Sequence, residues 1–233
     1  MLDEVDSTNA EALRLAPTLS GPCWILARWQ TAGRGRLGRR WTDPTGNFAV
    51  SLALSLDEPP ARKALRSFVA ALALHDALVS LTGLSGAFTL KWPNDVLLNG
   101  GKLSGILLET GADGILVVGI GVNLRSAPEP DAEALFPPVA LRVKTGFDIG
   151  AETLLDHLAP AFAQWEDRLR SEGFAPLRAA FLERAARLGE HVRARTPAVT
   201  HEGRFETIDS EGALVLDTPQ GRVTVPAADV FFP

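Results

Sequence analysis

The sequence predicts an α/β domain followed by a small β-barrel. Phe48–Leu56 (FAVSLALSL) alternates as a β-strand does, and Ala64–Leu81 is a long, nearly all-apolar helical stretch, which suggests burial against a sheet. From Gly189 the pattern changes to short strands broken by Gly, Asp and Pro, which is typical of a small β-module. With 46% hydrophobic and 22% charged residues, the 233-residue chain can bury a core, and we expect domains at 1–187 and 188–233.

The N-terminal elements are predicted to be a short helix and two strands joined by a long loop. Asp6, Ser7 and Thr8 are residue types that cap helix N-termini, and the helix after them should end before Pro17. Cys23–Gln30 has the pattern of a buried strand, and the alternating strand described above follows it. The connection of roughly 17 residues between the strands is rich in Gly, Arg and Thr. Loops of this length in compact domains are usually functional lids or disordered segments.

The middle of the chain alternates short strands and turns. Pro93-Asn94-Asp95 predicts a kink between two apolar segments, and Asn99-Gly100-Gly101 predicts a turn. Lys102–Thr110 and Gly114–Asn123 should then pair as a β-hairpin. The Pro-rich stretch that follows predicts no regular element, and the expected helices beyond it are Thr153–Ser171 and Ala175–Leu188.

The overall composition excludes several classes of protein. A net charge of −5 argues against binding nucleic acid through a general basic field. The one cysteine, Cys23, rules out an internal disulfide and a cysteine-based zinc site, and its apolar surroundings predict a buried, inert thiol. The N-terminus lacks the basic-then-apolar order of a signal peptide, and we expect no apolar stretch of the about 20 residues that a membrane span needs. The chain is therefore expected to be cytoplasmic.

The most informative segment is Gly33–Trp41 (GRGRLGRRW), which carries four arginines and three glycines. Its glycines fit the GxGxxG fingerprint, but the residues after them would not propagate the helix that a dinucleotide site requires. A P-loop fails too, because Gly101-Lys102 is followed by Leu103. Two interpretations of the segment remain. It could be a merely solvated loop, but the better interpretation is a loop whose backbone N–H groups and guanidinium groups face an anion. The length of the segment suits a lid over a phosphate-bearing ligand.

Three further segments could contribute to the same site. In Lys91–Asp95 (KWPND) the proline fixes where Asn94 and Asp95 point, although a buried Trp beside a turn would look the same. Lys102 could return to the end of the sheet that carries Asp95, or it could be a solvated edge residue. The glycines of Gly119–Asn123 (GIGVN) could let a ligand approach the strand closely, with Asn123 as a polar contact. Alternatively, the segment could be a simple strand end.

Taken together, these segments resemble the biotin–protein ligases, which attach biotin to a lysine of a carboxylase carrier domain. The matching residues, in the order and at the spacing of the family pattern, are Asp6–Asn9, Gln30, Gly33–Gly35, Arg36, Gly38, Arg39, Trp41, Lys91–Asp95, Lys102, Gly105, Gly119–Gly121 and Asn123. The likeness covers most of the chain. It implies a central mixed β-sheet with flanking helices, as in class II synthetases, and a C-terminal SH3-like barrel.

The resemblance implies a two-step reaction with biotin and ATP as substrates. Biotin carboxylate attacks the α-phosphate to give biotinyl-5′-AMP and pyrophosphate, and the carrier lysine then attacks the mixed anhydride to give an amide and AMP. No covalent enzyme intermediate is needed, which agrees with the lack of a Ser/His/Asp or Cys/His set in the sequence. Mg²⁺ is expected on the ATP phosphates, with no metal site in the protein.

The resemblance also implies roles for individual residues. Lys102 is expected to contact the biotin carboxylate and the α-phosphate, Arg36 and Arg39 to hold phosphates, and Asp95 to help deprotonate the acceptor lysine. The expected catalytic residues are Lys102, Arg36 and Asp95. The expected biotin-binding residues are Ser7, Thr8, Asn9, Gln30, Gly33, Arg34, Lys102 and Gly105, with Ser7, Thr8 and Gln30 on the ureido group. The expected ATP- or adenylate-binding residues are Arg36, Arg39, Trp41, Asn94, Lys102 and Asn123.

Other functions remain open at this point. A lipoate– or octanoate–protein ligase could share the fold, although the polar set of Ser7, Thr8, Asn9 and Gln30 favours a ureido ring over a lipoyl chain. The chain could also be a nucleic-acid-binding module that uses its arginine-rich segment, or a structural adaptor. Only five residues precede Asp6, so we expect no DNA-binding repressor role. The sequence leaves the oligomeric state open, with a homodimer among the alternatives, and the Pro226–Asp229 region matches the family ending only loosely.

Overall fold

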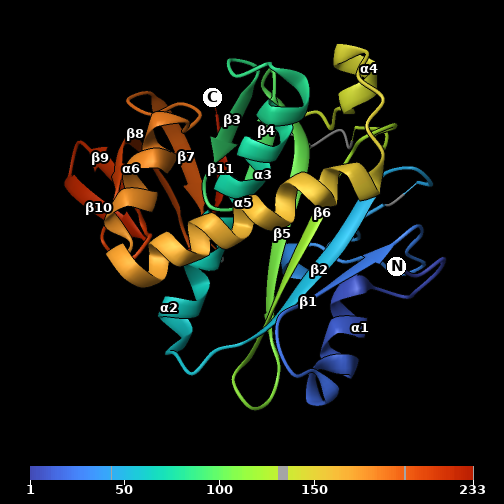
Figure 1. Ribbon diagram of the computed structural model, residues 1–233. Helices are drawn as coiled ribbons and strands as arrows, with labels where there is room; N and C mark the ends of the chain where they lie inside the picture. The colour runs from blue at the N-terminus through green and yellow to red at the C-terminus, as the bar shows by residue number, and fades with distance from the viewer. Residues whose placement is uncertain (43, 131–135, 197, 233) are drawn as a thin grey trace.

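The computed structural model describes residues 1–42, 44–130, 136–196 and 198–232. Two β-sheets organise it (Figure 1). The larger sheet has six strands in the order β1-β2-β6-β5-β4-β3, and each pair of neighbours is antiparallel. Its strands are β1 (Cys23–Ala27), β2 (Phe48–Ser55), β3 (Phe88–Lys91), β4 (Asp95–Leu98), β5 (Gly101–Thr110) and β6 (Ile115–Val122). Parallel pairing at this sheet consists of single bridges, such as Leu2–Ala27 and Val5–Gln30.

Alternation along the strands sends side chains to two different layers. Residues such as Leu52 and Val118 belong to the main core, which includes α3 (Arg66–Thr82) and α5 (Ala151–Glu172). Their neighbours Ala53 and Val117 face a smaller cluster with Ala12 of α1 (Thr8–Leu15). The other helices are α2 (Pro60–Ala64), α4 (Leu141–Thr145) and α6 (Ala175–Glu183). The sheet therefore lies between α1 and the α3/α5 layer.

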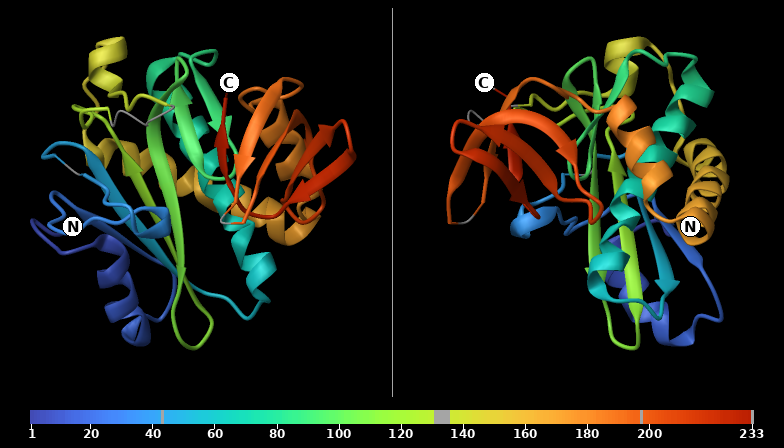
Figure 2. Two further views of the ribbon diagram at one scale, coloured as in Figure 1. Left: turned by 180° about the vertical axis from the view of Figure 1, so that it is seen from behind. Right: turned by 90° about the vertical axis from the view of Figure 1, so that its left-hand side faces the viewer.

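The second sheet forms the C-terminal module, in the strand order β10-β9-β8-β7-β11. Its strands, all antiparallel, are β7 (His191–Arg195), β8 (Thr200–Ile208), β9 (Leu214–Thr218), β10 (Gly221–Val225) and β11 (Asp229–Phe231). Figure 2 shows this module beside the edge of the large sheet that ends in β3. The Trp92 indole N–H donates to the Gly212 carbonyl (2.9 Å), and Leu90 exchanges backbone bonds with Arg184 and Ala186. The module is thus packed directly against the large sheet.

Several expected boundaries were wrong. The first strand ends at Ala27, before Gln30, and the last helix of the larger domain ends at Glu183, short of Leu188. The Pro-rich stretch holds a short helix, α4, which the sequence did not indicate. Cys23 is half-buried rather than buried, because it starts the outermost strand.

The expectation about membrane-length segments also needs correction. Pro60–Thr82, 23 residues with a mean hydropathy of 1.5 in its most apolar window, is long and apolar enough to cross a membrane. That window is 72% buried inside the fold, and residues of α3 such as Leu72 and Leu74 have no exposed surface. A helix covered all round by protein is hydrophobic for the same reason that a core is. The segment is accounted for as the central helix of this domain.

The helical layer is held by one fully buried cation. Arg66, at the start of α3, has a relative exposure of 0% and bonds to both Glu58 and Glu166, the latter through Nε (3.0 Å) and Nη2 (2.7 Å). These contacts join the segment before α2 to α3 and α5. Because the carboxylates are themselves mostly covered, removal of the arginine would leave unpaired buried charge.

We therefore predict that Arg66→Ala lowers the free energy of unfolding by about 3–5 kcal/mol in urea denaturation. The control is Arg204→Ala, which removes an exposed ion pair with Asp217 and should cost about 0–1 kcal/mol. Equal losses for the two variants would show that Arg66 does not brace the helices.

Candidate active site

A cavity of about 450 Å³ opens between the large sheet, the start of α1, the loop Gly33–Trp41 and the C-terminal module. We call this loop the arginine loop. The cavity wall brings together thirteen of the residues that the sequence indicated: Ser7, Thr8, Asn9, Gln30, Arg34, Arg36, Arg39, Trp41, Asn94, Asp95, Lys102, Gly105 and Asn123. Gly33 is not part of the wall. A Cβ at Gly33 would lie 2.7 Å from the Trp41 carbonyl oxygen, so this glycine lets the two ends of the loop meet.

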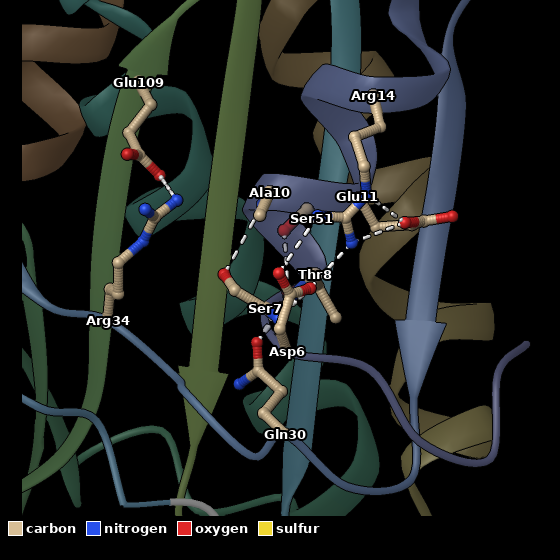
Figure 3. Close-up of polar contacts among 10 residues, drawn as sticks. All are labelled: Asp6, Ser7, Thr8, Ala10, Glu11, Arg14, Gln30, Arg34, Ser51 and Glu109. Carbon is tan, nitrogen blue, oxygen red and sulfur yellow. Dashed lines mark hydrogen bonds and ion pairs between the residues drawn. The ribbon is translucent and has the colours of Figure 1, made fainter.

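A buried polar group, which we call the floor cluster, consists of Thr8, Asn9, Gln30 and Ser51. The Thr8 backbone N–H donates to Gln30 Oε1 (2.8 Å), and the Thr8 hydroxyl lies 3.1 Å from the same oxygen. The Ser51 hydroxyl oxygen is 2.8 Å from the Thr8 hydroxyl and 2.5 Å from Asn9 Oδ1. Figure 3 shows Gln30 reaching toward Thr8 at the start of α1, with Ser51 on the neighbouring strand β2. Such a cluster can match a compact polar group, because it offers several donors and acceptors within one small space.

Local sequence explains how the floor cluster forms. Ser7 is extended and caps α1 by accepting from the Ala10 N–H, which puts Thr8 and Asn9 on the first turn. Asn9 can fit only because residue 119 is glycine: a Cβ there would lie 2.1 Å from Asn9 Oδ1. The first glycine of the GIGVN segment therefore makes room for a side chain of this protein.

A second group of charges, the charge cluster, consists of Lys91, Asp95 and Lys102. Lys91 Nζ donates to Asp95 Oδ2 (3.0 Å), and Lys102 Nζ donates to Asp95 Oδ1 (2.7 Å). Burial of Asp95 would raise its pKa, but the two ammonium groups outweigh that effect and lower the pKa to about 2. Two cations share one carboxylate, so the cluster keeps a net positive charge at the cavity wall.

Strand register produces the charge cluster. Lys91 and Asp95 are paired residues on either side of the tight Trp92-Pro93-Asn94 connection between β3 and β4. Asp95 in turn pairs with Gly105 of β5, and an irregularity between Val96 and Leu97 brings Lys102 opposite Leu97. The expectation that Lys102 returns to the end of the sheet that carries Asp95 is confirmed.

The low pKa argues against one expected role, that of Asp95 as a base. A group with a pKa of about 2 is a weak base, and both carboxylate oxygens of Asp95 already accept from lysines. Asp95 is therefore poorly suited to deprotonate an acceptor lysine. Its geometry fits a different task, which is to hold Lys102 Nζ in a fixed place.

The arginine loop is an ordered, hairpin-like structure in its backbone. Arg34 and Arg40 form an antiparallel bridge, Gly35 N–H donates to Arg39 O (2.7 Å) and Trp41 N–H donates to Gly33 O (2.9 Å). Two of its side chains reach other parts of the cavity. Arg36 donates to Asn94 Oδ1 (3.2 Å), and Arg39 pairs with Asp229 of β11 (2.5 Å).

Trp41 lies over the sheet at two glycines. A Cβ on Gly121 would be 2.4 Å from the Trp41 ring, and one on Gly105 would be 3.3 Å from it. Trp41 Nε1 and Asn123 Oδ1 are buried polar atoms with no hydrogen-bond partner among the described residues. Buried polar atoms are nearly always paired, so two such atoms in one cavity wall indicate groups arranged for a ligand.

Some residues of the site were not predicted from the sequence. Lys91 lies in the KWPND segment, but the sequence indicated no role for it. Ser51 could have been found as a polar residue in an otherwise apolar strand. The C-terminal module also contributes to the wall through Arg195, Asp229 and Phe231, and no local pattern indicates that these residues fold back onto the sheet.

The fold and site together define an enzyme that can bind an anionic substrate beside paired lysines and a polar group in an adjacent, enclosed space. Residues 2–124 match the model of the biotin/lipoate A/B protein ligase family, and residues 188–232 match that of the biotin protein ligase C-terminal domain.

Individual relatives agree with these matches. The chain is 54% identical to the biotin–[acetyl-CoA-carboxylase] ligase of Paracoccus denitrificans, over 100% of this chain and 99% of that protein. It is 36% identical to the enzyme of the same name from Mycobacterium tuberculosis, over 97% and 86% of the two chains. The biotin protein ligase of Aquifex aeolicus, solved in complex with biotin and ATP, superposes with a TM-score of 0.85 at 27% identity, covering 98% of this chain and 95% of that one.

This chain therefore belongs to the biotin/lipoate A/B protein ligase family, and within it to the biotin protein ligases. The predicted biotin ligase function stands over the lipoate, octanoate and nucleic-acid alternatives. The predicted α/β fold class is confirmed as well, including the SH3-like C-terminal module, but the central sheet is antiparallel where a mixed sheet was expected.

The charge cluster generates a prediction about acid stability. The folded-state pKa of Asp95, about 2, lies below its ordinary value of 3.8, so its contribution is complete above about pH 4 and is lost as the pH falls toward 2. A shift of this size corresponds to about 2 kcal/mol. In urea titrations at pH 5, 4 and 3, Asp95→Asn should be less stable than the parent at pH 5 but lose less stability on acidification.

Asp217→Asn serves as the control, since Asp217 forms an exposed ion pair. Its pH dependence should follow that of the parent. If Asp95→Asn also followed the parent, Asp95 would not be held ionised by the two lysines.

Proposed function

We propose that this chain attaches biotin to a carrier-domain lysine in two ATP-dependent steps. A biotin carboxylate oxygen forms a bond to the α-phosphorus of ATP, and the bond to pyrophosphate breaks. The amine of the carrier lysine then forms a bond to the biotin carbonyl carbon, AMP leaves and the amine loses a proton. One observation carries the proposal: a single cavity joins a buried polar floor to a cationic wall, as a substrate with a polar ring and a carboxylate requires.

The cationic wall supplies the first step. Lys102 Nζ is fixed by Asp95 beside the cavity, where it can bind both the biotin carboxylate and the α-phosphate. Without a cation, these two anions would repel each other as they approach. Arg36 and Arg39 line the same cavity and fit the remaining phosphate charge. Asp95 acts here as the anchor of Lys102, in place of the base expected from the sequence.

The floor cluster fits the ureido ring of biotin. The ring presents two N–H donors and one carbonyl acceptor, and an unmet buried hydrogen bond costs about 1–3 kcal/mol. Thr8 and Gln30, with Ser7 beside them, give hydroxyl and amide groups that can meet this pattern. We assign Asn9, Arg34 and Gly105 to the same end of the substrate, because they line the wall nearby.

The adenosine end is assigned to Trp41, Asn94 and Asn123. Trp41 Nε1 and Asn123 Oδ1 offer one donor and one acceptor that no described residue uses. Asn94 is held by its bond to the Ile106 carbonyl (2.6 Å) and presents Oδ1 to Arg36, so it links the sheet to the arginine loop.

Magnesium is proposed to come with ATP. No group of three or more His, Cys, Asp and Glu side chains in the described part of the chain could hold a metal ion. Asp95 and Asp229 line the cavity but are already paired with cations. Phosphate oxygens are good Mg²⁺ ligands, so the nucleotide can carry the ion itself.

The partner is proposed to be a biotin carboxyl carrier domain. We propose that the chain itself consists of two domains, a catalytic domain at residues 1–187 and a C-terminal module at residues 188–233. The module supports this division with its own five-stranded sheet, and it completes the cavity wall through β7 and β11.

An ATP-dependent reaction and an unpaired cysteine suit the cytoplasm. A homodimer is also proposed, because the single bridges at Ala27 and Leu90 cover only part of the outermost strands β1 and β3.

Pyrophosphate exchange into ATP tests the proposed function. The purified chain is assayed with biotin, lipoate, octanoate or no acid. Exchange with biotin alone is the expected result. Exchange with lipoate or octanoate would overturn the substrate assignment, and no exchange with any acid would overturn the adenylation step.

Lys102→Ala should lower the exchange rate by about two to three orders of magnitude, since one cation that stabilises the reacting phosphate is lost. The control Lys144→Ala removes an exposed lysine of α4 and should leave the rate unchanged. Circular dichroism should show both variants folded. A near-normal rate for Lys102→Ala would remove this lysine from the reaction.

Closure of the arginine loop should be visible as protection from trypsin. Arg34, Arg36, Arg39 and Arg40 are trypsin sites on one largely exposed loop, and a loop that closes on adenylate should be cut more slowly with biotin plus ATP. Cleavage at Arg142 in α4 provides an internal control. Equal cleavage of the loop with and without substrates would contradict a lid.

A further inference from the structure

Glu109, on β5, has no part in the reaction described above, yet it touches two residues assigned to the substrate. Its Oε2 accepts from Asn9 Nδ2 (2.7 Å) and from Arg34 Nη2 (3.3 Å). Glu109 is absent from the residues that line the cavity, and it contacts the cavity wall from the side through Asn9 and Arg34. Figure 3 shows the Arg34 side chain leaving the loop to meet Glu109 on its strand.

The contact with Asn9 decides which way the Asn9 amide faces. A carboxylate can only accept hydrogen bonds, so the NH₂ group of Asn9 must point at Glu109. Asn9 Oδ1 then points at Ser51, 2.5 Å from its hydroxyl oxygen. Gly119 leaves just enough room for this amide, and the residue is 4% exposed, so the side chain has little freedom to choose another position.

The orientation of Asn9 sets the rest of the floor cluster. Ser51 has one hydroxyl proton, and the acceptor at 2.5 Å, Asn9 Oδ1, takes it. The Ser51 oxygen is then an acceptor toward the Thr8 hydroxyl, 2.8 Å away. Thr8 is the residue that also contacts Gln30. The carboxylate therefore sets the direction of the hydrogen bonds from Asn9 through Ser51 to the Thr8 hydroxyl, whereas the Thr8 backbone N–H donates to Gln30 in any case.

We propose that Glu109 is a positioning residue for biotin: by fixing the Asn9 amide, it sets the hydrogen-bonding sense of the floor cluster that receives the ureido ring. This inference rests on the proposed function. The ion pair with Arg34 is the weaker contact, because both side chains are partly exposed, at 46% and 27%. The charge-assisted bond to a buried amide is the stronger one, so the effect of Glu109 runs mainly through Asn9.

The test compares biotin binding by calorimetry, without ATP, in three variants. Glu109→Met keeps the length of the side chain but removes the acceptor, and it should weaken biotin binding about tenfold, the value of one charge-assisted hydrogen bond. Glu109→Gln retains an oxygen that can accept from Asn9 and should stay within about threefold of the parent. Glu11→Met is the matched control: Glu11 is also paired with an arginine and is 23% exposed, and its loss should not change biotin affinity.

Two further readouts separate positioning from a merely structural role. In pyrophosphate exchange, Glu109→Met should raise the KM for biotin and leave the KM for ATP unchanged. In an Asn9→Ala background, Glu109→Met should cause no second loss of biotin affinity, because its effect passes through Asn9.

Unchanged biotin affinity in Glu109→Met would overturn the inference. So would a parallel rise in both KM values, or a full second loss in the Asn9→Ala background. If the parent chain exchanges pyrophosphate with biotin but the Glu109 variants give one of these contradicting results, only the inference about Glu109 is overturned. If the parent shows no biotin-dependent exchange and no biotin binding, the proposed function falls and the inference with it.

Discussion

Asp95 lies buried between the ammonium groups of Lys91 and Lys102, and the geometry of the cavity depends on this contact. Neither the carboxylate nor Lys91 could be buried alone, since an unpaired charge in the interior is strongly unfavourable. Pairing resolves that problem and leaves one positive charge in excess, carried by the more exposed Lys102. A stabilising contact of the fold thus also delivers the cation that the proposed adenylation needs.

The other half of the cavity depends on small residues. Gly119 has no side chain where Asn9 packs, and Gly121 has none where Trp41 packs. Strand β6 is therefore flat enough for side chains from α1 and the arginine loop to lie on it. On the neighbouring strand β5, Glu109 is placed to orient Asn9. Polar recognition is therefore built on α1 and β2, and charge neutralisation on β3, β4 and β5, around one sheet.

Sequence reasoning predicted those features that depend on local pattern. The hairpin of β5 and β6, the cap at Ser7 and the proximity of Lys102 to Asp95 follow from alternation, residue type and turn position. It failed where distant segments decide the outcome. The weak basicity of Asp95 depends on Lys91 and burial together, and the contribution of Asp229 depends on how the C-terminal module folds back onto the sheet. Neither the burial of Asp95 nor a contact between residues 190 positions apart can be read from a short window of sequence.

The most direct test of the account is the rate of biotinyl-adenylate formation in a single turnover by Asp95→Asn, with Lys91→Met/Asp95→Asn measured alongside. The double variant removes a buried positive charge together with its partner and so protects the fold. If Asp95 places Lys102, both variants should form adenylate at least about tenfold more slowly than the parent while still binding biotin. Parent-like rates in the folded double variant would show that Lys102 reaches the α-phosphate without Asp95, and would contradict the central role given to this contact.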